Sequence, residues 1–247
     1  IGIDVPGFGV PTHAEAKDIL AAAMLKVARS EIEMGPVASP RQKQSDMPSV
    51  TLLGEIFPVD PISISMMLEK MNLSVGPVVP TREWRELYSA FNGSVIAALH
   101  PFYSASVREF EAAGRPVVGS APVGVDGTNN WLEKIGLVAD VARKKIDEAK
   151  NSILPLIKQN LEKNKIKGKI TLSGYEGSEL IVARLLIESG AEVKYVGTAC
   201  PKTKFSEDDL QWLEEKNVHV QYRASLEDDL AAMREYSPDL TIGTTPI

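Results

Sequence analysis

The sequence predicts an α/β protein with Rossmann-like parallel sheets, each covered by helices on both faces. Three observations indicate this class. Short apolar strands alternate with amphipathic helices along most of the 247-residue chain. The connections are short and contain the Gly and Pro residues that end such elements. Hydrophobic residues make up 44% and charged residues 24% of the chain, which excludes a disordered tail or a coiled coil.

Residues 1–49 are expected to form the end of a first α/β domain and a linker. The opening run IGIDVPGFGVP is interpreted as a short strand that enters a Gly/Pro loop. Thr12 and Glu15 have the spacing of a capping box, which predicts a helix over residues 12–28. Residues 30–49 contain three prolines and no hydrophobic period, which favours a loop or a domain boundary.

Residues 50–140 are expected to form a middle Rossmann-like domain. Apolar runs predict four strands, at 50–57, 74–80, 93–102 and 115–124. Helices are predicted between them, around residues 64–71, over 81–91 from Thr81, and over 104–114 up to Gly114. Since connections this short join parallel strands only through helices, both faces of this sheet should be covered.

The remaining chain is expected to contain connecting helices and the start of a third domain. Residues 128–163 have a helical pattern, and Pro155 predicts either a kink or two consecutive helices there. The connecting segment is placed at 141–167 and the third Rossmann-like domain at 168–247. Strands are predicted at 168–174, 191–199, 218–222 and 238–246, with helices at 178–190, 206–217 and 225–236.

Charge and cysteine content exclude several function classes. The chain has 27 Lys and Arg against 33 Asp and Glu, a net charge of −6, which argues against a general nucleic-acid or anionic-membrane binder. Neither a transmembrane segment nor a signal peptide is recognised, so a cytoplasmic location is expected. Cys200, the single cysteine, excludes a multi-cysteine metal site built by this chain alone, and a packing role is favoured over a nucleophile. Both ends of the sequence suggest an internal fragment of a longer protein.

Phosphate-binding loops are not recognised. The turn SGYEGS at 173–178 lies between a strand and a helix but has only two glycines, and GTACPKT at 197–203 has Pro201 where a P-loop needs glycine. Both are interpreted as structural turns. The helix N-terminus at Gly177 and Ser178 nevertheless has the geometry that suits an anion.

Three polar residues occupy positions that favour a ligand site. His100 and Glu55 end apolar strands, and His13 follows a Gly/Pro loop in the first turn of a helix. In open α/β sheets the ligand crevice lies at the carboxyl ends of the strands. The alternative for each residue is a structural role, in which the side chain only bonds the backbone of a loop.

The amino-acid sequence resembles the nitrogenase-component-1-like superfamily. TLLGEIFPVD, HPFYSAS and GKITLSGYEGSELIVARLLIESGAEVKYVGT carry the resemblance to the superfamily as a whole. The branch of it that reduces chlorophyllide a in bacteriochlorophyll synthesis is similar in detail at VPGFGVPTHAEAKD, VVPTREWRELYSA, HPFYSAS, GTACP and RASLEDDLAA. The resemblance covers essentially the whole chain.

The resemblance implies an ATP-dependent, dark-operative oxidoreductase that reduces the C7=C8 bond of ring B of chlorophyllide a. It implies a heterotetramer with a second subunit, the Z subunit, and an iron protein, the X subunit, that binds ATP-Mg and donates electrons. A 4Fe-4S cluster relays the electrons, and its ligands are expected outside this sequence, so no metal ligand is assigned within it. A photosynthetic context follows from the same resemblance.

The resemblance also gathers the candidate residues into one substrate pocket. His13 and His100 are assigned as candidate catalytic residues, a histidine being able to donate a proton after electron arrival. Glu55, Phe102, Tyr103 and Ser104 are assigned to the pocket wall, where an aromatic ring can stack on the macrocycle. Two alternatives remain: a subunit of protochlorophyllide reductase or another nitrogenase-like reductase, and, from a different class, a two-lobed α/β solute-binding module.

Overall fold

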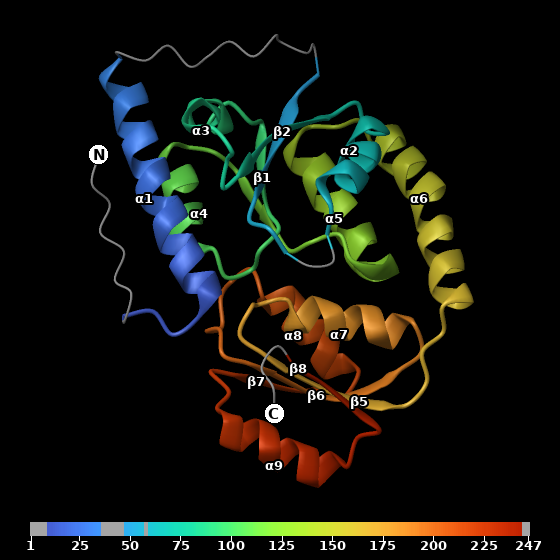
Figure 1. Ribbon diagram of the computed structural model, residues 1–247. Coiled ribbons are helices and arrows are strands. Elements are labelled where there is room, and N and C mark those ends of the chain that lie inside the picture. The colour runs from blue at the N-terminus through green and yellow to red at the C-terminus, as the bar shows by residue number, and fades with distance from the viewer. Residues whose placement is uncertain (1–8, 36–46, 57–58, 244–247) are drawn as a thin grey trace.

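The computed structural model describes residues 9–35, 47–56 and 59–243, and contains two four-stranded parallel sheets in that part of the chain. In the view of Figure 1, one sheet with its helices forms the upper half and the other forms the lower half. The fold class expected from the alternation of strands and helices is therefore confirmed. The strand predicted in the opening run and the end of the last predicted strand lie outside the described residues.

The first sheet has the strand order β2-β1-β3-β4, and all its neighbours pair in parallel. Its strands are β1 (Ser49–Leu53), β2 (Ser74–Val79), β3 (Val95–Ala98) and β4 (Val117–Gly119). Side chains alternate along β1, so Val50 and Leu52 join one hydrophobic core and Leu53 joins another. Both faces of this sheet are therefore covered, as expected for parallel strands.

Helices from different parts of the chain cover the two faces of the first sheet. On one face lie α1 (His13–Met34), α3 (Trp84–Ala90) and α4 (Ser104–Ala112), and on the other lie α2 (Pro61–Glu69), α5 (Gly124–Val138) and α6 (Arg143–Lys163). Phe110 of α4 is fully buried in the core between the sheet and the first group of helices, and Trp131 of α5 is buried in the core between the sheet and the second group. Burial of apolar side chains between a sheet and its covering helices is the main favourable contribution to the stability of such a layered fold.

The second sheet has the order β7-β6-β5-β8, again with parallel neighbours. Its strands are β5 (Lys169–Gly174), β6 (Glu192–Thr198), β7 (His219–Tyr222) and β8 (Leu240–Gly243). Figure 1 shows α7 (Glu179–Glu188) and α8 (Glu207–Glu215) on the side facing the first half and α9 (Leu226–Tyr236) on the opposite side. Ile181 of α7 packs into a core of the first half, so the two halves share apolar contacts.

A buried ion pair also lies where the halves meet. Nη1 of Arg184 on α7 donates to Oδ1 of Asp209 on α8 at 2.5 Å, and both side chains are almost fully buried. Ser120, which follows β4, donates to the other oxygen of Asp209 at 3.0 Å. The guanidinium carbon of Arg184 lies 4.8 Å from the ring centroid of Trp212. Asp209, paired with Arg184 within the second half, therefore connects this half to the first through Ser120.

Several helix ends follow the predicted capping residues. The backbone N–H of Glu15 donates to Oγ1 of Thr12 at 3.1 Å, which confirms Thr12 as the N-cap of α1. Ser225 caps α9 in the same way, with Asp228 completing a capping box. The start of α3 differs from the prediction, because the helix begins at Trp84 and Glu83 is its N-cap. Thr81 instead donates its hydroxyl to the carbonyl oxygen of Glu83.

Other boundaries also differ from the predictions. The first helix runs to Met34 rather than ending near residue 28, because Gly35 in a left-handed conformation (φ 80°) terminates it. The helix α5 begins at Gly124 rather than at residue 128, which shortens the predicted strand at 115–124. Pro155 lies inside α6 without ending it, and the break between α5 and α6 falls at residues 139–142. None of the described helices combines the length and the apolar run that a bilayer span requires.

Candidate functional site

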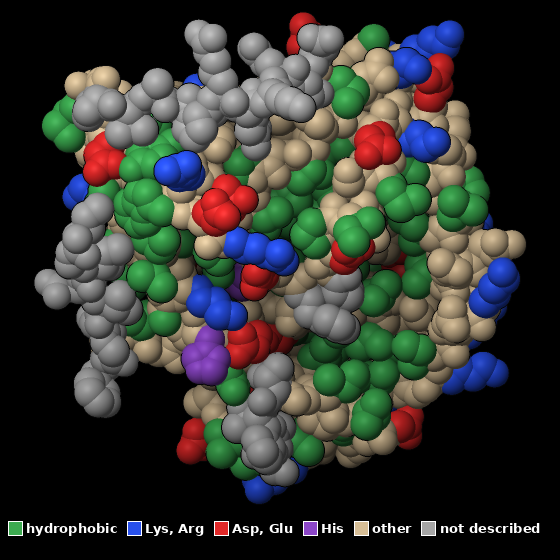
Figure 2. Space-filling model, turned by 45° about the horizontal axis from the view of Figure 1, so that its top comes forward, with side chains coloured by type: hydrophobic (Ala, Val, Ile, Leu, Met, Phe, Trp, Pro, Cys, Tyr) green, Lys and Arg blue, Asp and Glu red, His purple; other side chains and the backbone are tan. Residues whose placement is uncertain are grey.

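A cavity of about 680 Å³ opens at the carboxyl ends of β1, β2 and β3, facing the turn that follows β5. This volume lies within the usual range of small-molecule sites. Figure 2 shows a hollow where Lys or Arg, Asp or Glu, and histidine side chains gather on the surface. The lining combines polar groups with an apolar wall: Ala14, Lys17, Gly54, Glu55, Ile56, Val59, Pro61, Val78, Arg82, Leu99, His100, Glu176 and Ser178.

Both ring nitrogens of His100 are engaged within the protein. Its Nε2 lies 3.0 Å from the backbone carbonyl oxygen of Glu176, and its Nδ1 lies 3.3 Å from the backbone nitrogen of Phe102. A carbonyl only accepts and a backbone N–H only donates, so these partners assign the proton to Nε2. Burial lowers the pKa of His100 to about 4, and the positive charge of Lys17 acts in the same direction. His100 is therefore neutral near pH 7.

Tyr103 and Phe102 support His100 from the protein interior. The ring centroid of Tyr103 lies 4.4 Å from that of His100, and Phe102 approaches it edge-on at 5.9 Å. Both aromatic side chains are buried, and Phe102 packs against Ala14 and Cys200. Burial raises the pKa of the Tyr103 phenol above its ordinary value. Neither ring is among the residues that line the cavity, so the structure places them behind the site.

Ser104 is the first residue of α4 and lies beside the cavity rather than on its wall. The N-terminus of α4 is bonded by Asp18, whose carboxylate accepts the backbone N–H groups of Ala105 and Ser106 at 2.7 and 2.8 Å. Burial raises the pKa of Asp18, and these hydrogen bonds act against that effect. The contact attaches α1 to α4 directly beneath the cavity.

His13 lies at the rim of the cavity, next to the lining residue Ala14. Its Nδ1 is 2.8 Å from Oε1 of Glu176, and its ring meets Tyr175 edge-on at 5.1 Å. The side chain of His13 is 66% exposed, in contrast to the buried His100. Glu176 thus contacts both candidate histidines, His13 through its carboxylate and His100 through its backbone carbonyl.

Glu55 lines the cavity with an exposed side chain, as its position after β1 predicted. Sequence reasoning did not find Lys17, Arg82 or Glu176, which line the same cavity. Arg82 follows the carboxyl end of β2 and Glu176 follows that of β5, so the rule that selected Glu55 applies to both. Lys17 lies one helical turn after His13, a spacing that places both on one side of α1.

The turn at 173–178 does not leave an open anion site. The carboxylate of the buried Glu179 accepts the backbone N–H groups of Glu176 and Gly177 at 3.1 and 3.3 Å. It also accepts the hydroxyl of Thr198 at 3.0 Å. The backbone N–H groups that the sequence suggested for binding an anion are therefore occupied by the carboxylate of Glu179, a residue of α7 itself. Burial raises the pKa of Glu179, while these three donors favour its ionised form.

The described residues do not fit an iron–sulfur cluster. Cys200 is the single cysteine of the sequence and is completely buried beside Ala14 and Phe102, whereas a cluster is held by several cysteine thiolates. No group of three or more His, Cys, Asp and Glu side chains in the described part of the chain is arranged to hold a metal ion. Cys200 therefore has the packing role that the sequence favoured.

Two parallel sheets with a ligand cavity at their strand ends define an open α/β binding architecture. The chain belongs to the family described as nitrogenase component 1 type oxidoreductase, which it matches over residues 1–247. A solved structure titled "Nitrogenase Cp1 at pH 5" aligns with 95% of this chain and 53% of its own length, with a TM-score of 0.64 and 14% identity. That similarity shows the fold, and the family match confirms the resemblance of the sequence.

Two curated relatives carry names that are more specific than the description of the family. The "Chlorophyllide reductase 52.5 kDa chain" of Cereibacter sphaeroides is 63% identical over 247 residues, which cover all of this chain and 49% of the relative. The "Light-independent protochlorophyllide reductase subunit N" of Staurastrum punctulatum is 27% identical over 216 residues, 82% of this chain and 44% of the relative. The chain thus spans about half the length or less of these two relatives.

Proposed function

We propose that this chain is part of a subunit of a chlorophyllide reductase and that its cavity binds the tetrapyrrole substrate. The 63% identity to a chlorophyllide reductase chain, against 27% to a protochlorophyllide reductase subunit, favours the former. One structural observation carries the proposal, namely the roughly 680 Å³ cavity at the strand ends, with Ile56, Val59 and Leu99 on its apolar side. Such a wall suits the faces of a largely apolar macrocycle.

The proposed reaction adds two electrons and two protons to the C7=C8 bond of ring B. The electrons come from partners of this chain: an iron protein loaded with ATP-Mg, and a 4Fe-4S cluster shared with a Z-type subunit. The cluster ligands lie outside the described residues. The chain would therefore bind the substrate, keep water from it and supply protons. The same proposal includes a division of the chain into two Rossmann-like domains. They comprise residues 50–140 and 168–247, and residues 141–167 join them.

The contacts of the candidate residues suggest different roles. His100 is neutral and uses both ring nitrogens inside the protein, which suits a positioning residue rather than a proton donor. Glu55 on the cavity wall and His13 at its rim carry exchangeable protons at accessible positions. We assign proton supply to these two, with Glu55 facing the substrate. Phe102, Tyr103 and Ser104 hold the loop that carries His100.

The test is an anaerobic assay of the full-length protein with its Z-type partner and iron protein. Chlorophyllide a and protochlorophyllide are offered separately, and tetrapyrrole reduction is followed by absorbance. We expect turnover of chlorophyllide a, and Glu55→Gln to lower kcat by about 10²-fold or more, as for loss of a general acid. Reduction of protochlorophyllide alone would favour the alternative reductase. Tight ligand binding without reduction would favour a solute-binding module.

His100→Ala separates positioning from proton donation in the same assay. A positioning residue should raise the KM or lower kcat without removing a limb of the pH–rate profile, because the proton is supplied elsewhere. Unchanged turnover and affinity would exclude His100 from the site.

A further inference from the structure

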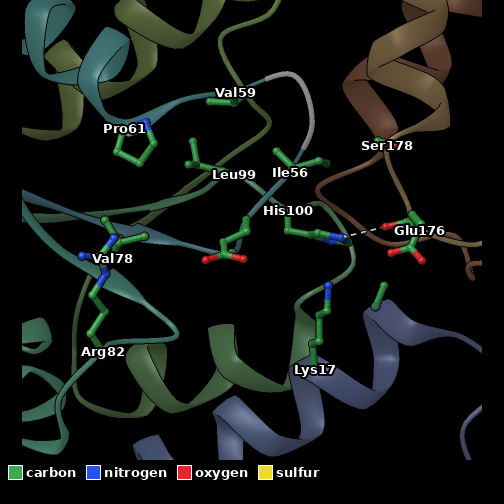
Figure 3. Close-up of a pocket in the computed structure, with 13 residues that line it drawn as sticks. Lys17, Ile56, Val59, Pro61, Val78, Arg82, Leu99, His100, Glu176 and Ser178 are labelled. Atoms are coloured by element: carbon green, nitrogen blue, oxygen red, sulfur yellow. Dashed lines mark hydrogen bonds between the residues drawn. The ribbon is translucent and has the colours of Figure 1, made fainter.

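Two positively charged side chains in the cavity have no acidic partner in the structure. Lys17 and Arg82 both line the cavity, and neither side chain makes an ion pair within the described part of the chain. Lys17 rises from α1 toward His100 and Glu176, while Arg82 enters from the segment after β2 on the other side of the view (Figure 3). Cations that form no ion pair within a ligand cavity are suited to bind an anionic group of the ligand.

Neither acidic residue of the cavity wall forms an ion pair with these two cations in the described part of the chain. The carboxylate of Glu176 is bonded to His13 at 2.8 Å, so it is directed to the rim. Glu55 is the other acidic residue on the wall, and among the described residues it forms no ion pair with Lys17 or Arg82. A ligand with one carboxylate would therefore be attracted to this cavity.

Lys17 is held on a fixed element. The next residue, Asp18, is buried and bonds the N-terminus of α4 through Ala105 and Ser106. One turn earlier, His13 bonds Glu176 in the second half. The helix that carries Lys17 is thus attached to α4 and to the second half, so the backbone of Lys17 is held in place beside the cavity.

Arg82 is also on a backbone fixed by hydrogen bonds. Its own N–H donates to Oε2 of Glu86 at 3.1 Å, and the hydroxyl of Thr81 donates to the carbonyl oxygen of Glu83 at 2.9 Å. These bonds use the backbone and leave the Arg82 guanidinium toward the cavity. A guanidinium presents a planar pair of donors that matches the two oxygens of a carboxylate.

We infer that Lys17 and Arg82 form the recognition site for a free carboxylate on the ligand. This inference rests on the proposed function, since chlorophyllide a bears one free carboxylate, on the propionate side chain of ring D. Ring D lies diagonally across the macrocycle from ring B, which contains the C7=C8 bond. Binding the carboxylate at Lys17 and Arg82 would therefore select one orientation of the macrocycle, with ring B directed away from these two residues.

The test uses a matched ligand pair, chlorophyllide a and its methyl ester, which differ in that one charge. Each is titrated by absorbance against the full-length protein in complex with its Z-type partner. The variants are Lys17→Met and Arg82→Met, which keep most of the apolar stem. Lys26→Met on α1 and Arg85→Met on α3 are the controls, because both side chains are exposed and neither lines the cavity.

We expect the wild-type complex to bind the acid about tenfold or more tightly than the ester, the scale of one charge-assisted contact. Lys17→Met and Arg82→Met should each weaken the acid about tenfold and leave the ester unchanged, while both controls match the wild type. Equal weakening of acid and ester, or a charge-specific loss in only one variant, would overturn the inference. Failure of the wild-type complex to bind either compound would instead overturn the proposed function.

Discussion

The Nε2 atom of His100 lies 3.0 Å from the backbone carbonyl oxygen of Glu176, a residue 76 positions further along the chain. This hydrogen bond joins the loop after β3 to the turn after β5, and so connects the two sheets at the edge where the cavity opens. The Nδ1 atom of the same ring accepts the backbone N–H of Phe102, which only a neutral imidazole can do, so the geometry of the site depends on the protonation state of a buried titratable group.

The pH dependence of stability should report this buried histidine. The pKa of His100 is about 4 in the folded protein, whereas a histidine in the unfolded chain has the ordinary pKa of 6.5. Between these two pH values the unfolded chain therefore binds more protons than the folded protein. This contribution to stability is therefore complete above the unfolded pKa and falls as pH drops from about 6.5 to 4, by up to about 3 kcal/mol. Denaturant unfolding at several pH values in this range measures it.

The variant His100→Gln removes the titrating group and should flatten that part of the stability profile. It should also lower stability at pH 7.5, where the native hydrogen bonds are intact. His219→Gln, which removes an exposed histidine on β7, is the control. A profile as steep in His100→Gln as in the wild type would show that other groups account for the pH dependence.

Gly177→Ala should disturb the same contact by steric overlap. An added Cβ would lie 2.5 Å from Cδ2 of Phe102 and 2.7 Å from Cε1 of His100, at a φ of 85°. Gly114→Ala is the matched control, because it has a similar φ of 70° and nothing within 4 Å of the added atom. The backbone conformation should destabilise both variants by about 1 kcal/mol, and overpacking should add about 1–3 kcal/mol in Gly177→Ala alone.

Denaturant midpoints measure the difference between the two glycine variants, and ligand titration shows whether the cavity also changes. Equal destabilisation of Gly177→Ala and Gly114→Ala would mean that the packing of Gly177 against His100 and Phe102 is not rigid.

The ion pair of Arg184 and Asp209 should be necessary for stability although it is buried. Arg184→Met leaves the carboxylate of Asp209 buried with Ser120 as its remaining hydrogen-bond partner, and should cost about 3–5 kcal/mol. Replacing both residues, Arg184→Met with Asp209→Leu, removes the unpaired charge and should restore a large part of that loss. The free energy of unfolding of the two single variants and the double variant gives the coupling. A loss below about 1 kcal/mol in Arg184→Met would contradict this assignment.

Cys200→Ala should leave the iron content of the assembled complex unchanged. The thiol is fully buried against Phe102 and Ala14, with a pKa raised to about 12, so we expect it to be unreactive as well. Iron analysis and the rate of alkylation of the native protein check the two expectations, and the substitution should destabilise the fold by about 1 kcal/mol. Loss of iron in Cys200→Ala would make Cys200 a ligand.

Much of the fold could be predicted because its signals are local. Alternating apolar strands and helices indicated parallel sheets, and Thr12 and Ser225 marked two helix starts through capping residues. Pro155 predicted a kink or two consecutive helices, and the structure shows that α6 is not divided at this residue. The helix α1 extends beyond its predicted end, where Arg29 pairs with Glu33 on the next turn and with Glu109 of α4.

The candidate site was predictable only in part. Glu55 and His100 line one cavity because both follow neighbouring parallel strands, which end at the same edge of a sheet. Phe102 and Tyr103 lie behind it, since their rings are buried against His100 rather than turned to the opening. Local sequence does not reveal on which side of a loop such rings pack.

The sequence by itself determined the class of fold, the strand ends at which a ligand site would form, and the family resemblance carried by motifs along the chain. Tertiary structure alone decided that Glu176 meets both His13 and His100, that His100 is neutral, and that Lys17 and Arg82 face one cavity. The physical reason is that burial, hydrogen-bond partners and pairing of charges depend on how the two sheets dock. Residues far apart in the chain meet only there, and no local pattern records that contact.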